Sequence, residues 1–531
     1  MKLTTVAHIE EPTRVTASHA TILDQFISNV PDFIKRTSVE APVSTNDHCT
    51  IGLYLLFRIR KKKAYSRLIW DFNHTNWDNF REALENAELE KCTESNDINI
   101  SCEQLTNRIM EIAKHIIPNK TITIRPNDKP WYTEDLRRQR RIKDRLYQKA
   151  KTKKTVAAWT LFNQTRNLYY QGIKNAKQQY DSTKYTLLVD EGKRNSKKWW
   201  HILKSLLGQT SDSEIPPLLC DLEIITDDKE KASAFNNFFA GAAQLDDTNA
   251  ELPVLDHYDG PILEDITVTR QDVMDQLIAL DTSKAYGPDG LSPKLLKEGR
   301  LAIAPVLCKL YNKSLHACSV PHLWKRANVI PIHKKGKREL MNNYRPVSLI
   351  SSGAKIFEKI VFKYIFNHFK DNFLISLWQS GFLPGRSTVT QLTELYHSFC
   401  KAVADGKEVR VVFLDISKAF DRVWHKGLLT KLHNFGIRGR LLDWFTDYLK
   451  ERYQRVVLSG QCSDWAELKS GVPQGAVLGP LLFLVFINDI VYVVRHCKIR
   501  MFADDTCLFI EVDNREEAAA NINDDMDSIS N

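Results

Sequence analysis

The segment that most constrains this chain is Ile499–Ile510, which reads IRMFADDTCLFI. Two apolar arms rich in aromatic and branched residues flank the adjacent acids Asp504 and Asp505, a composition that predicts a β-hairpin. Unpaired carboxylates buried beside a core would cost several kcal/mol. The two acids are therefore expected at an exposed turn or beside a bound cation, and a divalent metal is the simplest partner.

Other pairs of adjacent aspartates occur in the chain, but in a different context. They lie in polar sequence that is typical of a solvated surface: Asp227 with Asp228, Asp246 with Asp247, and Asp524 with Asp525. The apolar surroundings, more than the dipeptide, single out the pair in the hairpin.

A second predicted strand also ends in an acid. Val409–Ile416 reads VRVVFLDI and carries Asp415 near its end, followed by a turn that enters a helix. Three carboxylates at the ends of two neighbouring strands suit two Mg²⁺ ions about 3.5–4 Å apart, one activating a hydroxyl and one stabilising the leaving oxygen. This is the chemistry of a nucleotide polymerase.

Three segments together resemble a known family. Phe413–Asp421 (FLDISKAFD), Ser470–Phe483 (SGVPQGAVLGPLLF) and Phe502–Asp505 (FADD) resemble palm motifs A, B and C of reverse transcriptases from non-LTR (LINE-type) retrotransposons, in particular the jockey-like group. The resemblance implies an RNA-directed DNA polymerase that adds deoxynucleotides to a primer 3′-hydroxyl. It also implies an α+β fold, with right-hand fingers and a palm built on an antiparallel sheet.

The resemblance assigns roles to the acids. Asp415 and Asp504 would bind two Mg²⁺ ions, with Mn²⁺ as an alternative, and Asp505 would support them. Asp421, in contrast, is expected to cap a turn or accept a hydrogen bond.

Further residues are candidates for nucleotide binding. Phe420 stands where related polymerases place a ring under the sugar, which would exclude a 2′-hydroxyl, although core packing is the alternative. Gln474 and Gly475 form a turn before an apolar helix, where glycine allows close backbone approach and the amide can hydrogen-bond template or nucleotide.

A basic turn follows one more predicted strand. Val329–Pro346 would be a finger strand pair over the incoming nucleotide, and Lys334, Lys335 and Arg345 would contact its triphosphate. A solvated turn or an import-like basic patch is the alternative reading.

The N-terminal region resembles the last strands of the endonuclease that precedes such polymerases. Asp47 and His48 match its closing catalytic pair, with Asn46 where the family commonly has Ser. Because the stretch that should carry the metal-binding Glu is absent, we expect a fragment of an α/β endonuclease without nuclease activity.

Charge is concentrated in one region. Residues 129–207 hold 20 Lys or Arg against 6 Asp or Glu, whereas the whole chain carries +9. Scarce glycine and proline predict long helices there. A nucleic-acid-facing surface is favoured over a merely solvated face.

These features divide the chain into four expected parts. Residues 1–60 would be the endonuclease remnant, 61–207 the basic helical linker, 208–262 a linker with a short helix, and 263–531 fingers and palm. Since only about twenty residues follow Ile510, the sequence predicts a product truncated at both ends and lacking a thumb.

Composition and sequence patterns bear on the cellular location of the protein. The ten cysteines form no CxxC pair, no signal peptide is evident, and an intracellular location, nuclear or cytoplasmic within a ribonucleoprotein, is expected. Gly475–Val494 is apolar over the length of a membrane span, but Pro480 and Asp489 within it favour a buried helix.

The expected partners are an RNA template, a DNA primer or target, and deoxynucleoside triphosphates, with no membrane. Two alternatives remain open. One is an inactive product that acts at most as a basic nucleic-acid-binding protein. The other is a viral RNA-dependent RNA polymerase or a group II intron maturase, against which Phe420 and the FADD form argue.

Overall fold

The computed structural model describes residues 6–15, 19–28, 34–42, 48–55, 65–124, 129–191, 196–207, 215–220, 223–255 and 258–530. The chain divides into two compact units. The first comprises residues 1–64 and 124–216, and the second comprises residues 65–123 and 217–531.

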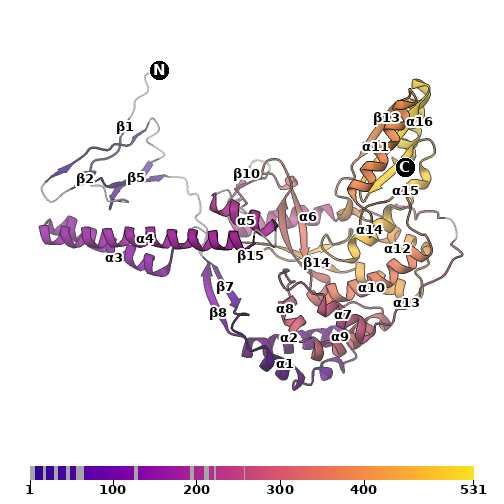
Figure 1. Cartoon of the computed structure of the whole chain (residues 1–531), viewed down its shortest axis with the longest axis horizontal. Helices are drawn as coiled ribbons and strands as arrows, with labels where there is room; N and C mark the ends of the chain where they lie inside the picture. The colour runs from indigo at the N-terminus through magenta and orange to yellow at the C-terminus, as the bar shows by residue number, and fades with distance from the viewer. Residues whose placement is uncertain are drawn as a thin grey trace. The chain divides into compact units, whose positions relative to one another are not determined.

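The first unit combines short strands with long helices (Figure 1). Its elements are β1 (Val6–Ala7), β2 (Arg14–Val15), β3 (Ala20–Thr21), β4 (Ile27–Ser28), β5 (Ile34–Glu40), β6 (Thr50–Leu55), α3 (Glu134–Lys153), α4 (Val156–Glu191) and α5 (Ser196–Leu206). Val39 of β5 and Cys49, just before β6, share one core with Tyr147, Trp159 and Phe162 of the helices. The predicted long helices are therefore present, and α3 and α4 pack together.

The second unit contains a helical core that joins distant parts of the sequence. Its α-helices are α1 (Trp77–Glu85), α2 (Ile98–Ile116), α6 (Asp228–Ala242), α7 (Arg270–Ile278), α8 (Pro293–Glu298), α9 (Arg300–His316), α10 (Ser352–Asp371), α11 (Thr388–Ala404), α12 (His425–Asn434), α13 (Gly439–Leu449), α14 (Leu478–Ile487), α15 (Ile490–Val493) and α16 (Arg515–Ser530). Buried residues of α1, α2, α9, α10, α13 and α14 form one continuous apolar cluster.

That cluster changes the expected linker. Phe80 and Ile109 are fully buried in the same core as Leu310 on α9, with Trp70, Phe72 and Trp77 packed against it. Residues 65–123 consequently belong to the second unit, whereas the rest of the predicted 61–207 linker that the structure describes lies in the first. The reason is the apolar face of α1 and α2, which is buried against α9.

One sheet of the second unit is mixed. It runs β12–β11–β14–β15, with β16 also paired to β14; β11 and β12 are antiparallel, and β11 and β14 are parallel. These strands are β11 (Arg326–His333), β12 (Tyr344–Leu349), β14 (Arg452–Leu458), β15 (Gln461–Cys462) and β16 (Ala466–Leu468). Helix α6 packs on one face, where Phe235 meets Tyr344 edge to face.

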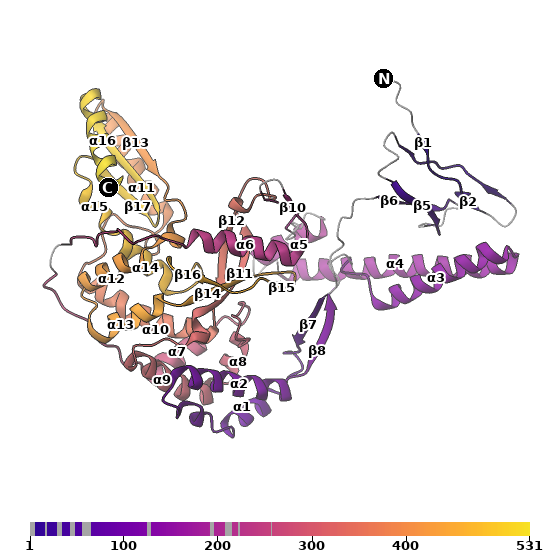
Figure 2. The same cartoon turned by 180° about the vertical axis from the view of Figure 1, so that it is seen from behind.

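The other sheet carries the acidic segments. Its antiparallel order is β13–β18–β17, built from β13 (Glu408–Leu414), β17 (Lys498–Phe502) and β18 (Asp505–Val512). Leu395 and Phe399 of α11 cover one face, while α15 and α16 cover the other through residues such as Ile490 and Met526. Figures 1 and 2 show this helix–sheet–helix sandwich with α11, β13 and α16 side by side.

The second unit also contains two two-stranded sheets: β7 (Tyr65–Trp70) with β8 (Asn119–Ile124), and β9 (Leu218–Cys220) with β10 (Glu223–Ile225). The apolar stretch Gly475–Val494 forms α14 and α15, and α14 is buried in the main core. Among the described residues, no helix has both the length and the apolar composition needed to cross a bilayer.

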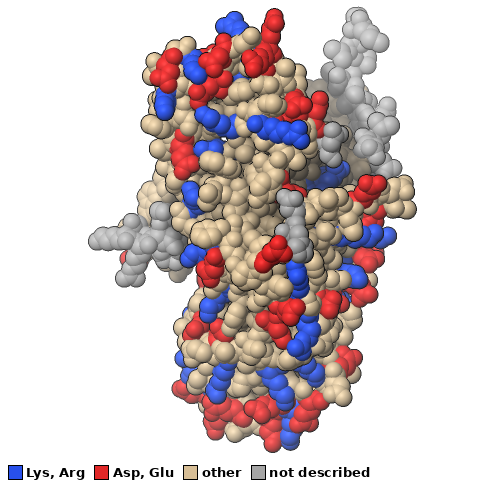
Figure 3. Space-filling model, turned by 90° about the vertical axis from the view of Figure 1, so that its right-hand side faces the viewer, with Lys and Arg blue, Asp and Glu red and all other residues tan. Residues whose placement is uncertain are grey.

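Figure 3 shows acidic and basic side chains interspersed over one face of the molecule. Opposite charges also pair at the three-stranded sheet, where Lys498 of β17 meets Glu511 of β18, and Arg515 of α16 meets Glu408 of β13. The face drawn in Figure 3 therefore carries no large patch of a single charge sign.

Candidate functional site

The predicted acidic hairpin is present, and its turn is tight. Phe502 on β17 pairs with Asp505 on β18, so Ala503 and Asp504 alone connect the strands. We call Phe502–Asp505 the acid turn. Ala503 has a φ of +57°, a left-handed conformation that a residue with a Cβ rarely adopts. The turn directs two successive carboxylates to the same end of the sheet.

Asp415 lies at the same end, on the neighbouring strand. It directly follows Leu414, which pairs with Thr506, the residue after Asp505. Asp415 and Asp505 are exposed and Asp504 is half-buried. Burial raises the pKa of Asp504, and the negative charges of Asp505 and Asp415 raise it further. The fold thus places the three predicted acids close enough for the charges of Asp415 and Asp505 to act on Asp504.

None of these three acids forms an ion pair with a described Lys or Arg. Their oxygens do not all lie within 4.8 Å of one another. Hard oxygen ligands, mutual repulsion and one partly buried carboxylate suit a divalent cation such as Mg²⁺. The residues present therefore fit the predicted metal site.

The Gln474–Gly475 turn is held by two other segments. Gln474 accepts a backbone hydrogen bond from Ser348 of β12 at 2.7 Å, and its side-chain amide donates to Asp421 at 3.1 Å. Asp421 is therefore a hydrogen-bond acceptor, as expected. Gly475 has a φ of +117°, and a Cβ there would lie 2.6 Å from the Ser348 carbonyl oxygen. The glycine is thus required by contact with β12 within the protein itself.

Phe420 lies in the 3-10 helix η5 (Ala419–Arg422), just beyond Asp415. Its ring stacks on Phe483 with centroids 4.7 Å apart and meets Phe382 edge to face at 5.9 Å. It is half-buried. Core packing therefore accounts for one part of the ring, and the remaining part is accessible.

The three predicted cations of the β11–β12 hairpin are exposed. The positive charge of Lys334 opposes the burial that raises the pKa of both Asp504 and Asp421, which places Lys334 near the acids. Arg345 pairs across the hairpin with Ile332, on the face opposite to α6. For Lys335 the structure shows exposure and no ion pair with a described acid.

The N-terminal pair is described only in part. Asp47 lies outside the described residues. The Nδ1 of His48 is 2.7 Å from Oδ2 of Asp24, and this hydrogen bond is the first cause that lowers the pKa of Asp24. Sequence reasoning missed Asp24, because nothing in its local pattern distinguishes it.

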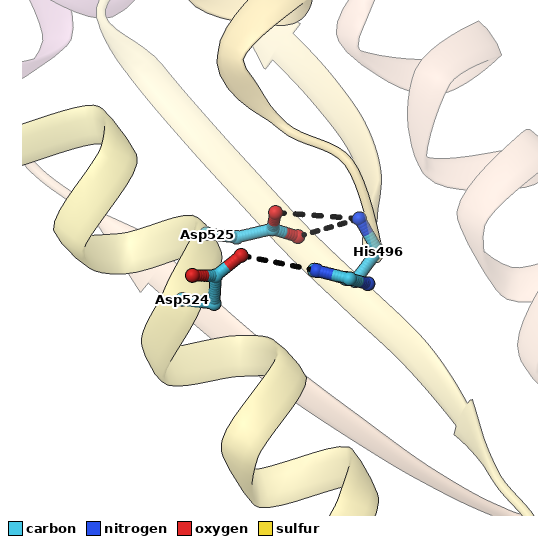
Figure 4. A group of neighbouring side chains, drawn as sticks. All are labelled: His496, Asp524 and Asp525. Atoms are coloured by element: carbon cyan, nitrogen blue, oxygen red, sulfur yellow. Dashed lines mark hydrogen bonds and ion pairs between the residues drawn. The ribbon is translucent and has the colours of Figure 1, made fainter.

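A different group of described residues meets the distances of a metal site. Ligand atoms of His496, Asp524 and Asp525 all lie within 4.8 Å of one another (Figure 4). The Asp525 carboxylate, however, already accepts hydrogen bonds from the backbone nitrogens of Arg495, His496 and Cys497 at 2.7 to 3.3 Å. The group locks α16 to the loop before β17. The expectation that Asp524 with Asp525 is merely a solvated pair is wrong for Asp525, which is 0% exposed.

Two buried polar residues near the site also escaped sequence reasoning. Gln379 hydrogen-bonds the acid turn, and Glu358 on α10 hydrogen-bonds the backbone at the start of α14. A polar residue inside an apolar pattern was the available signal, for Glu358 in particular, but its partners lie 90 to 120 residues away in the chain.

Residues 332–528 match the family model described as reverse transcriptase (RNA-dependent DNA polymerase). This segment is a reverse transcriptase domain. It includes the β11–β12 hairpin residues from Ile332 onward, the Gln474–Gly475 turn and all three predicted acids.

Individual relatives of the chain are also named as RNA-directed DNA polymerases. The chain is 29% identical over 340 residues to the probable RNA-directed DNA polymerase from transposon BS of Drosophila melanogaster, covering 60% of this chain and 37% of the relative. It is 34% identical over 224 residues to the RNA-directed DNA polymerase from mobile element jockey of the same species, covering 42% and 24%. The corresponding protein of transposon X-element is 30% identical over 258 residues, covering 48% and 28%.

These relatives confirm the resemblance to non-LTR reverse transcriptases that motifs A, B and C indicated. The chain spans between 24% and 37% of the length of these three relatives. They do not favour the alternative of an inactive product.

Proposed function

We propose that this chain is an RNA-directed DNA polymerase that adds deoxynucleotides to a primer 3′-hydroxyl on an RNA template. The observation that carries the proposal is the set Asp415, Asp504 and Asp505. These acids lie at the adjoining ends of neighbouring strands, unpaired by any described cation, inside a reverse transcriptase domain. In this proposal the three-stranded sheet is the palm, and the mixed sheet with α10 belongs to the fingers.

Asp415 and Asp504 would hold two divalent ions, with Asp505 in support. Mg²⁺ fits these oxygen ligands, and Mn²⁺ is an alternative. When bound, such ions supply a more acidic primer hydroxyl and stabilisation of the leaving pyrophosphate. The contribution of the chain is to hold three like-charged carboxylates at one sheet end, which raises their attraction for cations.

Other residues would position the nucleotide. Lys334, near Asp504, would neutralise triphosphate charge, and Lys335 and Arg345 would add contacts from the same hairpin. Phe420 would pack under the sugar and clash with a 2′-hydroxyl. Gln474 would act through its turn, which β12 and Asp421 hold in place.

The first unit would contribute affinity for nucleic acid. On α3 the exposed side chains include Arg138, Arg145 and Lys149, for which the structure shows no ion pair with a described acid. Cations spaced along one helix suit the phosphate backbone and give binding that weakens steeply with salt. We therefore assign RNA or DNA backbone contact to α3.

The test is primer extension on an RNA template with deoxynucleotides and Mg²⁺, comparing the unmodified protein with Asp504→Asn. Loss of metal stabilisation should lower the rate by at least about 10³, since each 1.4 kcal/mol is tenfold. Asp524→Asn is the matched control, because it makes the same change at an exposed acid of α16, and it should extend at the normal rate. Near-normal extension by Asp504→Asn would refute the proposal.

The non-enzymatic alternative makes a different prediction. It expects salt-sensitive binding of the template by the unmodified protein with no incorporation of any nucleotide. Ribonucleotides supplied in place of deoxynucleotides separate the polymerase classes, because an RNA-dependent RNA polymerase would prefer them.

A further inference from the structure

A short segment far from the acids in sequence pairs with the strand that leads to them. The Met501 amide of β17 donates to the Trp378 carbonyl at 2.9 Å, and the Ser380 amide donates to the Met501 carbonyl at 2.9 Å. In the order β13–β18–β17, β17 is an edge strand. Residues 378–381 therefore cover that edge next to the acid turn.

The Gln379 side chain extends this pairing into the turn itself. Its Oε1 accepts hydrogen bonds from the backbone nitrogens of Ala503 at 2.8 Å and Gly381 at 2.7 Å. Its Nε2 donates to the Ala503 carbonyl at 3.3 Å. Because Gln379 is only 2% exposed, little water competes for these bonds. One buried carboxamide thus binds both backbone polar groups of Ala503.

Ala503 is the residue whose conformation needs such support. Its φ of +57° costs an alanine roughly 1 kcal/mol or more relative to ordinary backbone. A strained conformation persists where its surroundings determine it, and the paired bonds from Gln379 do so. Since Ala503 directly precedes Asp504, its dihedral angles set the direction of that carboxylate.

The approach of the two segments is also unusually close. A Cβ on Gly381 would lie 2.1 Å from the Ala503 nitrogen, so only glycine allows this contact. Ala503 itself is 4% exposed. The residues on both sides of the contact therefore leave the turn little freedom to adopt another shape.

We propose that Gln379 is a positioning residue for metal binding, which holds the acid turn so that Asp504 is oriented toward the cation site. Gln379 is buried behind the turn and acts through Ala503 without contacting substrate. Its consequence for polymerisation rests on the proposed function, whereas its effect on metal affinity does not.

The experiment compares Gln379→Met with Asn312→Leu in the full chain. Asn312 on α9 makes the same kind of contact, since its carboxamide binds both the nitrogen and the carbonyl of Val268 at 2.9 and 2.8 Å. Both variants remove a carboxamide that bridges one residue's backbone, but only Gln379 adjoins the acids. Thermal unfolding checks that the two variants are comparably folded.

The first readout is Mn²⁺ binding followed by electron paramagnetic resonance, with Asp504→Asn defining the signal from the acid site. We expect Gln379→Met to weaken binding at that site by about 10-fold to 100-fold, the range for loss of a residue that orients a metal ligand. Asn312→Leu should bind Mn²⁺ as the unmodified protein does. The second readout is primer extension, in which kcat should fall while the KM for deoxynucleotide changes little.

The outcomes separate the two proposals. If the unmodified protein binds Mn²⁺ at the acid site, and Gln379→Met weakens that binding, the inference stands even when no variant extends a primer, and only the proposed function fails. If Gln379→Met binds Mn²⁺ as tightly as Asn312→Leu does, or if Asp504→Asn leaves Mn²⁺ binding unchanged, the inference is overturned.

A second variant covers the case in which Gln379→Met does not fold. Glycine adopts positive φ readily, so the double variant Gln379→Met with Ala503→Gly should fold even without the carboxamide, although nothing then fixes the direction of Asp504. It is then compared with Ala503→Gly alone. The same loss of Mn²⁺ affinity is expected, and equal affinity would overturn the inference.

Discussion

The Glu358 carboxylate of α10 lies 2.6 Å from the backbone nitrogen of Val477 and 3.2 Å from that of Leu478, where α14 begins. The Tyr448 hydroxyl donates to the same carboxylate at 3.0 Å. A fully buried acid on one helix therefore caps another helix. Because α14 directly follows the Gln474–Gly475 turn, this contact also fixes where that turn ends.

We expect Glu358→Ala to lower the free energy of unfolding by about 3 kcal/mol, because it leaves buried donors and the nearby Arg452 charge without their partner. Glu358→Gln should cost less than about 1 kcal/mol, because its amide oxygen still accepts from the helix and the Tyr448 hydroxyl can reverse its role. Urea unfolding of both variants measures the difference. Equal losses would show that the negative charge beside Arg452, and not the capping hydrogen bonds, explains the site.

Asp289 predicts a dependence of stability on pH. Burial raises its pKa from 3.8 to about 6, although Ser351 donates a hydrogen bond to it at 2.5 Å. The Asp289 carboxyl thus binds its proton more tightly in the folded state than in the unfolded state. The stability that this protonation contributes is complete below about pH 4 and is lost as the pH rises from about 4 to about 6.

Asp289→Asn should remove this loss, since the amide oxygen can still accept from Ser351. The variant should gain stability relative to the unmodified protein across that pH range, by up to about 3 kcal/mol at pH 7. Unfolding curves at a series of pH values measure the difference between the two proteins. A constant difference from pH 4 to 7 would contradict the raised pKa.

Two glycines with positive φ give a matched pair of alanine substitutions. Gly475→Ala should lower the free energy of unfolding by about 2–4 kcal/mol, because a Cβ there meets the Ser348 carbonyl in addition to the cost of its backbone angle. Gly385 has a φ of +79° with nothing within 4 Å of a Cβ, so Gly385→Ala should cost only about 1 kcal/mol. Thermal and urea unfolding test both, and similar costs would argue against the contact with β12.

The adjacent acids of α16 should behave differently from each other. Asp525→Ala removes the acceptor for three backbone N–H groups and should cost about 2–3 kcal/mol. Asp524 is exposed and pairs only with His496 among the described residues, so Asp524→Ala should change stability by less than about 0.5 kcal/mol. Chemical denaturation distinguishes the two. A large effect on Mn²⁺ binding by either variant would instead indicate a metal at this group.

The sequence alone indicated several strands and helices, because the formation of each depends mainly on residues that are neighbours in the chain. Two apolar arms rich in aromatic and branched residues around Asp504 and Asp505 predicted the hairpin of β17 and β18, and the apolar run before Asp415 predicted β13. Composition predicted the long helices α3 and α4, and the short helix expected within residues 208–262 is α6. These predictions succeed because the composition and periodicity of a strand or helix are properties of contiguous sequence.

Only the tertiary structure identified the contacts that hold the site. Gln379 binds Ala503 and Glu358 binds Val477, in each case across more than a hundred residues, and Asp24 meets His48 across 24. No local pattern specifies which distant backbone group a buried amide or carboxylate will satisfy. Chain topology decides that partner, because burial removes water and leaves the polar group only those donors and acceptors that the fold brings within reach.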